Sequence, residues 1–294
     1  MTTYAAIISL NSRLGAGVIA ESLARKLNDS VDLRLSLVGS GDEALHAARE
    51  AAQWAEVVVA VGGDGTVADV VTGIAGSPAA LGIVPAGSTN ITARSLGIPA
   101  HPRAAIQLLV QGHVAQPIDL GVSGDRCFVH MAGAGFDAEI FRGANPDLKR
   151  LLGWVAYLPA AAAALRLAPS DVTIQTDDAV VQARSPLVLV ANGASAVAPS
   201  FRLHPSIAVD DGWLDVLIFT ATTPAQVAAT IGHLGSMRLD RSPHVVWQRA
   251  RSVTISADPP LSVELDGDLH GSTPREFGIL PRGLRVLIPA PTDE

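Results

Sequence analysis

Residues 57–66 read Val-Val-Val-Ala-Val-Gly-Gly-Asp-Gly-Thr, an apolar run that ends in three glycines and one carboxylate. The run predicts a buried strand, and apolar residues at helical spacing from Val67 to Ile74 predict a helix directly after it. Glycine leaves no Cβ in the way of a ligand, and the first turn of such a helix directs free backbone N–H groups at the loop. The stretch therefore predicts a nucleotide phosphate site, with an ordinary glycine turn as the alternative.

Asp64 lies inside this loop, beside the expected phosphate. A carboxylate in that position is favourable mainly where Mg²⁺ or the proton of a hydroxyl lies between the two negative groups. Asp64 is therefore a candidate catalytic residue, and Gly62, Gly63, Gly65 and Thr66 are candidate phosphate contacts.

Two other loops follow predicted strands in the same way. Residues 11–17 begin with Asn11 and have the glycine spacing of a phosphate loop, although a plain turn explains them equally well. Residues 85–90 present Ser88, Thr89 and Asn90 at the start of another predicted helix. A helix cap by Ser88 would account for one of these three polar residues.

The order of the predicted elements divides the chain. Strand and helix patterns alternate over residues 1–122, which predicts an α/β domain with a mostly parallel sheet. Short strands dominate residues 123–279, with a single strand expected over 126–132, and predict a mainly antiparallel β-sandwich. The last strand, expected at 284–289 within residues 280–294, could rejoin either domain.

Composition excludes several classes of function. The net charge of −7 gives no support to a nucleic-acid partner. A single cysteine, Cys127, cannot form an internal disulfide, which favours a reducing cytoplasm, and the first eight residues lack the charged start of a signal peptide. The apolar segment 151–167 is interrupted by Gly153 and Pro159, so we expect a packing helix, with a surface contact to membrane as the alternative.

Two acidic turns lie in the second half of the chain. Residues 210–215 read Asp-Asp-Gly-Trp-Leu-Asp, a common turn that could also hold Mg²⁺. Residues 264–268 read Glu-Leu-Asp-Gly-Asp, either a hairpin turn or a turn that extends a carboxylate as a general base. Neither the histidines nor the cysteine has the spacing of a zinc site.

Taken in order, these motifs resemble the diacylglycerol kinase catalytic-domain family of bacterial lipid kinases, which includes sphingosine and ceramide kinases. The resemblance covers nearly the whole chain. It rests on residues 62–73, 82–90, 118–121, 132–139, 190–193, 210–215 and 266–268.

The resemblance implies a two-domain, ATP-dependent kinase that phosphorylates a lipid hydroxyl. Its first domain would be similar to phosphofructokinases and NAD kinases, with ATP held by the loops that contain Asn11, Gly62–Thr66 and Ser88–Asn90. It implies a structural Mg²⁺ at the side chain of Asp211 and the carbonyls of Ala208 and Trp213, and a proton acceptor at Asp268. The implied partners are a lipid substrate and a peripheral membrane surface, with a homodimer left open.

Three positions depart from the family pattern. Asp268 stands where the family usually has Glu, and a carboxylate with one methylene fewer reaches about 1.5 Å less. Ile91 replaces the Asp of the diacylglycerol kinases, and Ser12-Arg13 replaces a proline and a small residue. These departures keep a nucleotide-binding sensor without phosphoryl transfer as an alternative, and the shared Gly-Gly-Asp-Gly-Thr keeps an NAD kinase as another.

Overall fold

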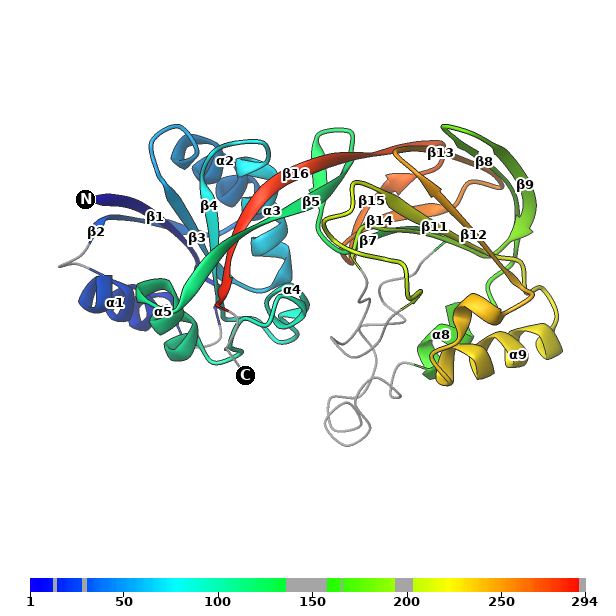
Figure 1. Ribbon diagram of the computed structural model, residues 1–294, viewed down its shortest axis with the longest axis horizontal. Helices are drawn as coiled ribbons and strands as arrows, with labels where there is room; N and C mark the ends of the chain where they lie inside the picture. The colour runs from blue at the N-terminus through cyan, green and yellow to red at the C-terminus, as the bar shows by residue number, and fades with distance from the viewer. Residues whose placement is uncertain (13–14, 28–30, 136–157, 165, 194–202, 291–294) are drawn as a thin grey trace. The chain divides into compact units, whose positions relative to one another are not determined.

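The computed structural model describes residues 1–12, 15–27, 31–135, 158–164, 166–193 and 203–290. The chain folds into two compact units, one from Met1–Leu120 with Arg282–Glu294 and the other from Gly121–Pro281 (Figure 1). In the described part of the chain, no helix is long and apolar enough to cross a membrane.

The first unit is built on a parallel sheet. Its strands lie in the order β2 (Val31–Val38), β1 (Thr2–Ser9), β3 (Val57–Gly62) and β4 (Ala80–Pro85), and the end of β16 (Arg275–Pro289) pairs in parallel with β4. Every residue of β3 and β4 is buried. Strands covered on both faces read as continuous apolar runs, which is why Val57–Val61 shows no alternation.

Helices cover both faces of this sheet (Figure 1). On one face α1 (Ala16–Leu27) and α5 (Pro102–Val110) share a buried cluster with residues of β1 and β3. On the other, α2 (Gly41–Ala51) packs against α3 (Asp64–Ile74), and a Cβ added at Gly73 would lie 2.4 Å from the Cβ of Ala48. A short helix, α4 (Ile91–Ser95), follows β4.

The second unit is a sandwich of antiparallel strands. One of its sheets contains β9 (Val180–Ser185), β8 (Ser170–Thr176), β13 (Ser252–Asp258) and the first part of β16. The last residues of β5 (His113–Ser123), from Gly121 onward, belong to this unit and pair with β6 (Arg126–Phe128). The other runs β12 (Val245–Ala250), β11 (Leu214–Phe219), β10 (Leu187–Ala191), β7 (Met131–Ala134), β14 (Ser262–Leu265) and β15 (Asp268–Ser272).

The two sheets bury a common core. Phe277 and Ile255 from one sheet belong to the same cluster as Val190 and Val216 from the other. The outer face of the second sheet is covered by α9 (Pro224–Gly235) and by the short helix η2 (Leu239–Arg241), which bury a separate cluster around Leu217. A further helix, α8 (Leu158–Ala164), precedes β8. The predicted fold class, an α/β domain followed by an antiparallel sandwich, is confirmed.

Three elements differ from the sequence-based expectation. The single strand expected over residues 126–132 is two strands, because β6 pairs with β5 in one sheet and β7 lies between β10 and β14 in the other. Strand β15 was not predicted, since its Leu269 is 64% exposed and breaks the expected burial pattern. Strand β16 begins at Arg275 rather than at residue 284. Of the helix expected over 151–167, residues 151–157 and 165 lie outside the described residues.

Candidate functional site

Two glycine loops touch at the carboxyl ends of β3 and β4. Gly62 is in register with Pro85, and the N–H of Ala86 donates to the carbonyl of Gly62 at 2.8 Å. A Cβ added at Gly87 would lie 2.5 Å from the Cα of Gly63. The loops therefore meet backbone to backbone, at a distance that only glycine permits.

The helix that follows the first loop has an open N-terminus. A Cβ at Gly62 would lie 2.5 Å from Oγ1 of Thr66, so this glycine makes room for the threonine that begins to turn the helix. Gly63 is the N-cap of α3, and within the described residues no side chain caps it. The unpaired N–H groups of such a helix, together with its dipole, favour an anion.

Asp64 and Asn90 organise the space between the loops. Oδ1 of Asp64 accepts a hydrogen bond from the N–H of Thr92 at 3.1 Å, in the first turn of α4. Asn90 has a φ of 47°. Its side-chain amide accepts a hydrogen bond from the N–H of Gly87 and donates one to the carbonyl of Gly87, both at 3.0 Å. Ser88, the residue expected as a possible cap of this helix, is exposed, and Asp64 takes that role from the neighbouring loop.

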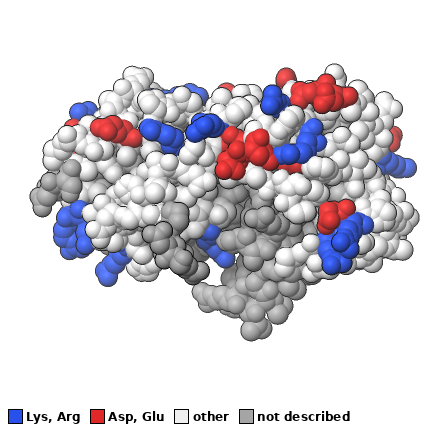
Figure 2. All heavy atoms as spheres, viewed as in Figure 1, with Lys and Arg blue, Asp and Glu red and all other residues white. Residues whose placement is uncertain are grey.

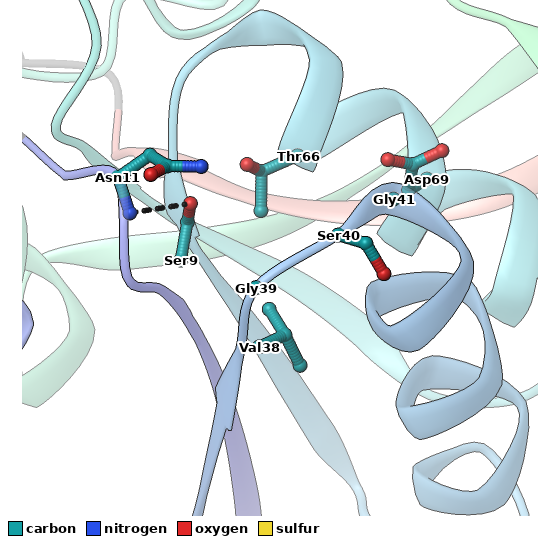
Figure 3. Close-up of a pocket in the computed structure, with 8 residues that line it drawn as sticks. All are labelled: Ser9, Asn11, Val38, Gly39, Ser40, Gly41, Thr66 and Asp69. Atoms are coloured by element: carbon teal, nitrogen blue, oxygen red, sulfur yellow. Dashed lines mark hydrogen bonds between the residues drawn. The ribbon is translucent and has the colours of Figure 1, made fainter.

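A polar pocket of about 220 Å³ opens beside these loops, between the ends of β1 and β2 and the first two turns of α3 (Figure 3). Its lining residues are Ser9, Asn11, Val38, Gly39, Ser40, Gly41, Thr66 and Asp69. Pockets for drug-sized ligands measure roughly 300–1,000 Å³, so this one has room for part of a nucleotide. Among the predicted contacts, it brings together Asn11 and Thr66.

Sequence reasoning missed three polar side chains of this pocket. Ser9 lies at the end of β1, where its Oγ accepts from the N–H of Asn11 at 3.3 Å (Figure 3). Ser40 is the N-cap of α2, and Asp69 on α3 lies so near Gly41 that a Cβ there would be 2.6 Å from its Oδ2. The available signal was the position of Ser40-Gly41 directly after a strand, since the carboxyl ends of parallel strands share one sheet edge.

The second acidic turn of the second unit joins β14 to β15. Asp266, with a φ of 47°, accepts hydrogen bonds from the N–H groups of Val129, His130 and Met131 at 2.7, 2.9 and 3.1 Å. Asn192 holds the same segment by donating from Nδ2 to the carbonyl of Val129 at 2.8 Å. Asp268, the predicted proton acceptor, is exposed at the start of β15.

The motif at residues 118–121 has a structural role. Oδ1 of the buried Asp119 accepts from the N–H of Arg282 at 2.6 Å, where β16 has a φ of 52°. A Cβ at Gly121 would lie 2.1 Å from the ring of Phe128. Of the other motif segments, residues 136–139 lie outside the described residues, as does Arg13.

Asp211, the predicted metal ligand, faces an arginine. Its Oδ2 accepts from Nη2 of Arg249, and its Oδ1 accepts from the N–H of Trp213 at 3.1 Å. Among the residues that the structure describes, no group of three or more His, Cys, Asp or Glu could hold a metal ion. As it lies, the carboxylate of Asp211 is paired with the guanidinium of Arg249.

Next to this pair, Asp215 is fully buried. Burial raises the pKa of its carboxyl, while a hydrogen bond from Nε1 of Trp247, at 2.8 Å, and the charge of Arg249 act in the opposite direction.

Comparison with known proteins identifies the family. The diacylglycerol kinase catalytic domain matches residues 9–122, and the YegS C-terminal NAD kinase beta sandwich-like domain matches residues 130–288. The chain belongs to the diacylglycerol kinase catalytic-domain family. A diacylglycerol kinase of Bacillus subtilis is 33% identical over 253 residues, which are 84% of this chain and 82% of that protein. A diacylglycerol kinase of Staphylococcus saprophyticus is 29% identical, over 85% of this chain and 82% of its own.

A solved structure has the same fold as this chain. The crystal structure of a diacylglycerol kinase from Bacillus anthracis aligns with a TM-score of 0.77 at 22% identity, covering 99% of this chain and 97% of that one. Membership of this kinase family supports a phosphotransferase with a diacylglycerol kinase-like catalytic domain.

Proposed function

We propose that the protein is an ATP-dependent lipid kinase, which transfers the γ-phosphoryl group of ATP to a hydroxyl of a diacylglycerol-like or related lipid. The observation that carries the proposal is the backbone contact between the two glycine loops, where Gly87 meets Gly63 at the open N-terminus of α3. This arrangement suits a triphosphate, because backbone N–H groups can approach its oxygens closely.

The first unit would bind the nucleotide. The phosphates would lie on the loop at Gly62–Thr66, with Ser88 and Thr89 as further contacts. The polar pocket beside Asn11 and Thr66 would take another part of the nucleotide. Asn90 would act by shaping its own loop, since both ends of its amide are bonded to Gly87.

Asp64 would hold the metal ion that accompanies the triphosphate. Its Oδ1 is engaged by Thr92, and within the described residues its Oδ2 has no hydrogen-bond partner, so that oxygen suits a cation or a water molecule bound to one. Mg²⁺ bound with ATP would neutralise charge on the phosphates as the transfer proceeds.

The transfer itself would be a displacement at phosphorus. The lipid hydroxyl oxygen forms a bond to the γ-phosphorus, the bond from that phosphorus to the bridging oxygen breaks, and ADP leaves with the electron pair. Asp268 accepts the hydroxyl proton, as its place in the family motif suggests. An exposed carboxylate at the start of a strand is accessible to such a substrate.

The lipid would be recognised by its apolar part rather than by charge. On the face shown in Figure 2, cationic and anionic side chains lie close together over the upper part of the molecule, and residues other than Lys, Arg, Asp and Glu cover most of the described surface. With a net charge of −7, general attraction to an anionic membrane is weak, so peripheral contact would depend on a local apolar surface.

The test is a transfer assay with γ-labelled ATP and Mg²⁺. The purified protein is incubated with extracted bacterial lipids, with pure diacylglycerol and sphingosine, and separately with NAD. We expect labelled lipid. Labelled NADP would instead identify an NAD kinase, and ATP binding without any labelled product would identify a nucleotide sensor, the outcome that the replacements at Ile91 and Asp268 would explain.

A further inference from the structure

In the acidic turn before β11, the carboxylate of Asp211 lies against the guanidinium of Arg249. We propose that the guanidinium of Arg249 is the permanent counter-cation of Asp211 and Asp215, and that this turn therefore folds without a divalent metal ion. The inference concerns a region that the proposed phosphoryl transfer does not use, and it departs from the metal site that the family resemblance implies.

The contacts of Arg249 reach both carboxylates. Its Nη2 donates to Oδ2 of Asp211, and its Nε lies at an ion-pair distance of 3.5 Å from Oδ1 of Asp215 without forming a hydrogen bond to a described residue. The side chains of Arg249 and Asp211 are 30% and 26% exposed, and that of Asp215 is 0% exposed. A buried carboxylate requires a nearby positive charge or hydrogen-bond donors, and in the described part of the chain Arg249 forms the ion pair with Asp215.

Strand register explains why the arginine lies there. Asp215 on β11 is directly opposite Arg249 on β12, so the two side chains leave the sheet on the same face. Trp247 lies two residues earlier on β12, hence on that face too, and donates to the same oxygen of Asp215. Asp211 reaches the guanidinium from the preceding turn, which Gly212 closes with a φ of 77°.

An aromatic ring holds the guanidinium from another side. The Cζ of Arg249 lies 5.6 Å from the ring centroid of Trp213, and the Cζ of Arg251 lies 4.7 Å from the same ring. A planar guanidinium suits both a carboxylate and an aromatic face. A second cation bound to Asp211 would lie within a few ångströms of Arg249 and would be repelled by it.

The experiment measures thermal unfolding without nucleotide, so its result is independent of kinase activity. Melting temperatures are recorded in EDTA, in MgCl₂ and in CaCl₂ at matched ionic strength, for the wild type, Arg249→Gln and Arg251→Gln. Arg251 is the matched control, because it lies over the same tryptophan ring but, in the described part of the chain, forms no ion pair with Asp211 or Asp215.

For the wild type, and likewise for Arg251→Gln, we expect the melting temperature in EDTA to agree with that in Mg²⁺ within about 1 °C. Arg249→Gln should melt lower in EDTA and recover when Mg²⁺ is added, and a further Asp211→Asn change should remove the recovery. A wild-type protein that melts lower in EDTA, with a recovery in Mg²⁺ that Asp211→Asn abolishes, would overturn the proposal. An Arg249→Gln protein as stable as the wild type would do the same.

A second measurement covers the case in which Arg249→Gln does not fold. Mg²⁺ is titrated calorimetrically into the EDTA-treated wild type in the absence of nucleotide. We expect no saturable binding below about 1 mM, and saturable binding in that range that is lost in Asp211→Asn would count against the internal cation.

Discussion

The carboxylate of Asp64 accepts a hydrogen bond of 3.1 Å from the backbone N–H of Thr92. The two residues belong to different glycine-loop and helix pairs: Asp64 begins α3, and Thr92 lies in the first turn of α4. One side chain therefore links both loops, and a substitution there can change stability and chemistry at once. The two effects can be separated by the choice of substituent.

Asp64→Asn keeps an oxygen that can accept from Thr92, whereas Asp64→Ala removes it. We expect the alanine variant to lose about 0.5–2 kcal/mol of unfolding free energy, the usual cost of a lost helix cap, and the asparagine variant to lose much less. Both should lose phosphoryl transfer by at least about 100-fold, the scale of removing one electrostatic contact in an active site. Urea unfolding and initial rates measure the two quantities, and wild-type turnover by a folded Asp64→Asn protein would remove Asp64 from the mechanism.

Gly87→Ala should drive the two glycine loops apart. Its Cβ would lie 2.5 Å from the Cα of Gly63, and overpacking of this kind costs about 1–3 kcal/mol. The matched control is Gly232→Ala on α9, where an added Cβ meets no atom of the described residues within 4 Å and alanine should gain about 0.5–1 kcal/mol. Calorimetry should show weakened ATP binding in Gly87→Ala alone; equal ATP affinity in both variants would show that the loop contact does not form the site.

Cys127 should resist alkylation in the folded protein. Burial raises the pKa of its thiol to about 11, and the thiolate is the reactive form. At pH 8 we therefore expect iodoacetamide to label the folded protein on the order of 100-fold more slowly than the urea-unfolded protein, whose thiol has an ordinary pKa near 8.5.

The labelling rate of Cys127 should also depend on pH differently in the folded and unfolded protein. The labelling rate of the folded protein should keep rising with pH toward about 11, whereas that of the unfolded protein should level off sooner. Because the folded thiol keeps its proton where the unfolded thiol has lost it, this group also lowers stability as the pH rises through that interval. Labelling at the same rate in both states would contradict the raised pKa of the half-buried thiol.

The sequence was most informative where one kind of burial governs a whole segment. Val57–Val61 is covered on both faces, so its unbroken apolar run led directly to a central strand and to the loop at Gly62. Strand β15 could not be found in this way, because Leu269 is exposed and the strand is held by pairing with β14 rather than by a buried face.

Contacts between distant residues were beyond sequence reasoning. The residue type of Asp64 indicated chemistry, but its bond to Thr92 depends on the adjacency of β3 and β4. In the same way, the pairing of Asp211 with Arg249 depends on the register of β11 and β12, which places the arginine opposite Asp215. A sequence motif therefore identifies the residues of a turn, whereas the pairing of the surrounding strands determines which residue contacts each carboxylate.

Asp266 and Asp268, two residues apart, should have separable roles. Asp266→Asn keeps the tolerance for a positive φ but places an N–H₂ group where a carboxylate oxygen accepted from the N–H of Val129 at 2.7 Å. A donor left without an acceptor costs about 1–3 kcal/mol, so we expect that loss of unfolding free energy. Asp268→Ala, at an exposed position, should change stability by about 0.5 kcal/mol or less.

For the rate of phosphoryl transfer, we expect Asp268→Ala to have a larger effect than Asp266→Asn. Asp268→Ala should lower kcat by about 10²–10⁴-fold, the usual contribution of a general base, and leave ATP affinity nearly unchanged. Asp268→Glu, the residue that the family resemblance implies at this position, should retain activity, because it keeps the carboxylate and extends its reach by about 1.5 Å. Initial rates, ATP calorimetry and urea unfolding of the three variants measure these effects. If Asp268→Ala turns over as fast as the wild type, Asp268 is not the general base. If Asp266→Asn is as stable as the wild type, Asp266 does not stabilise the loop.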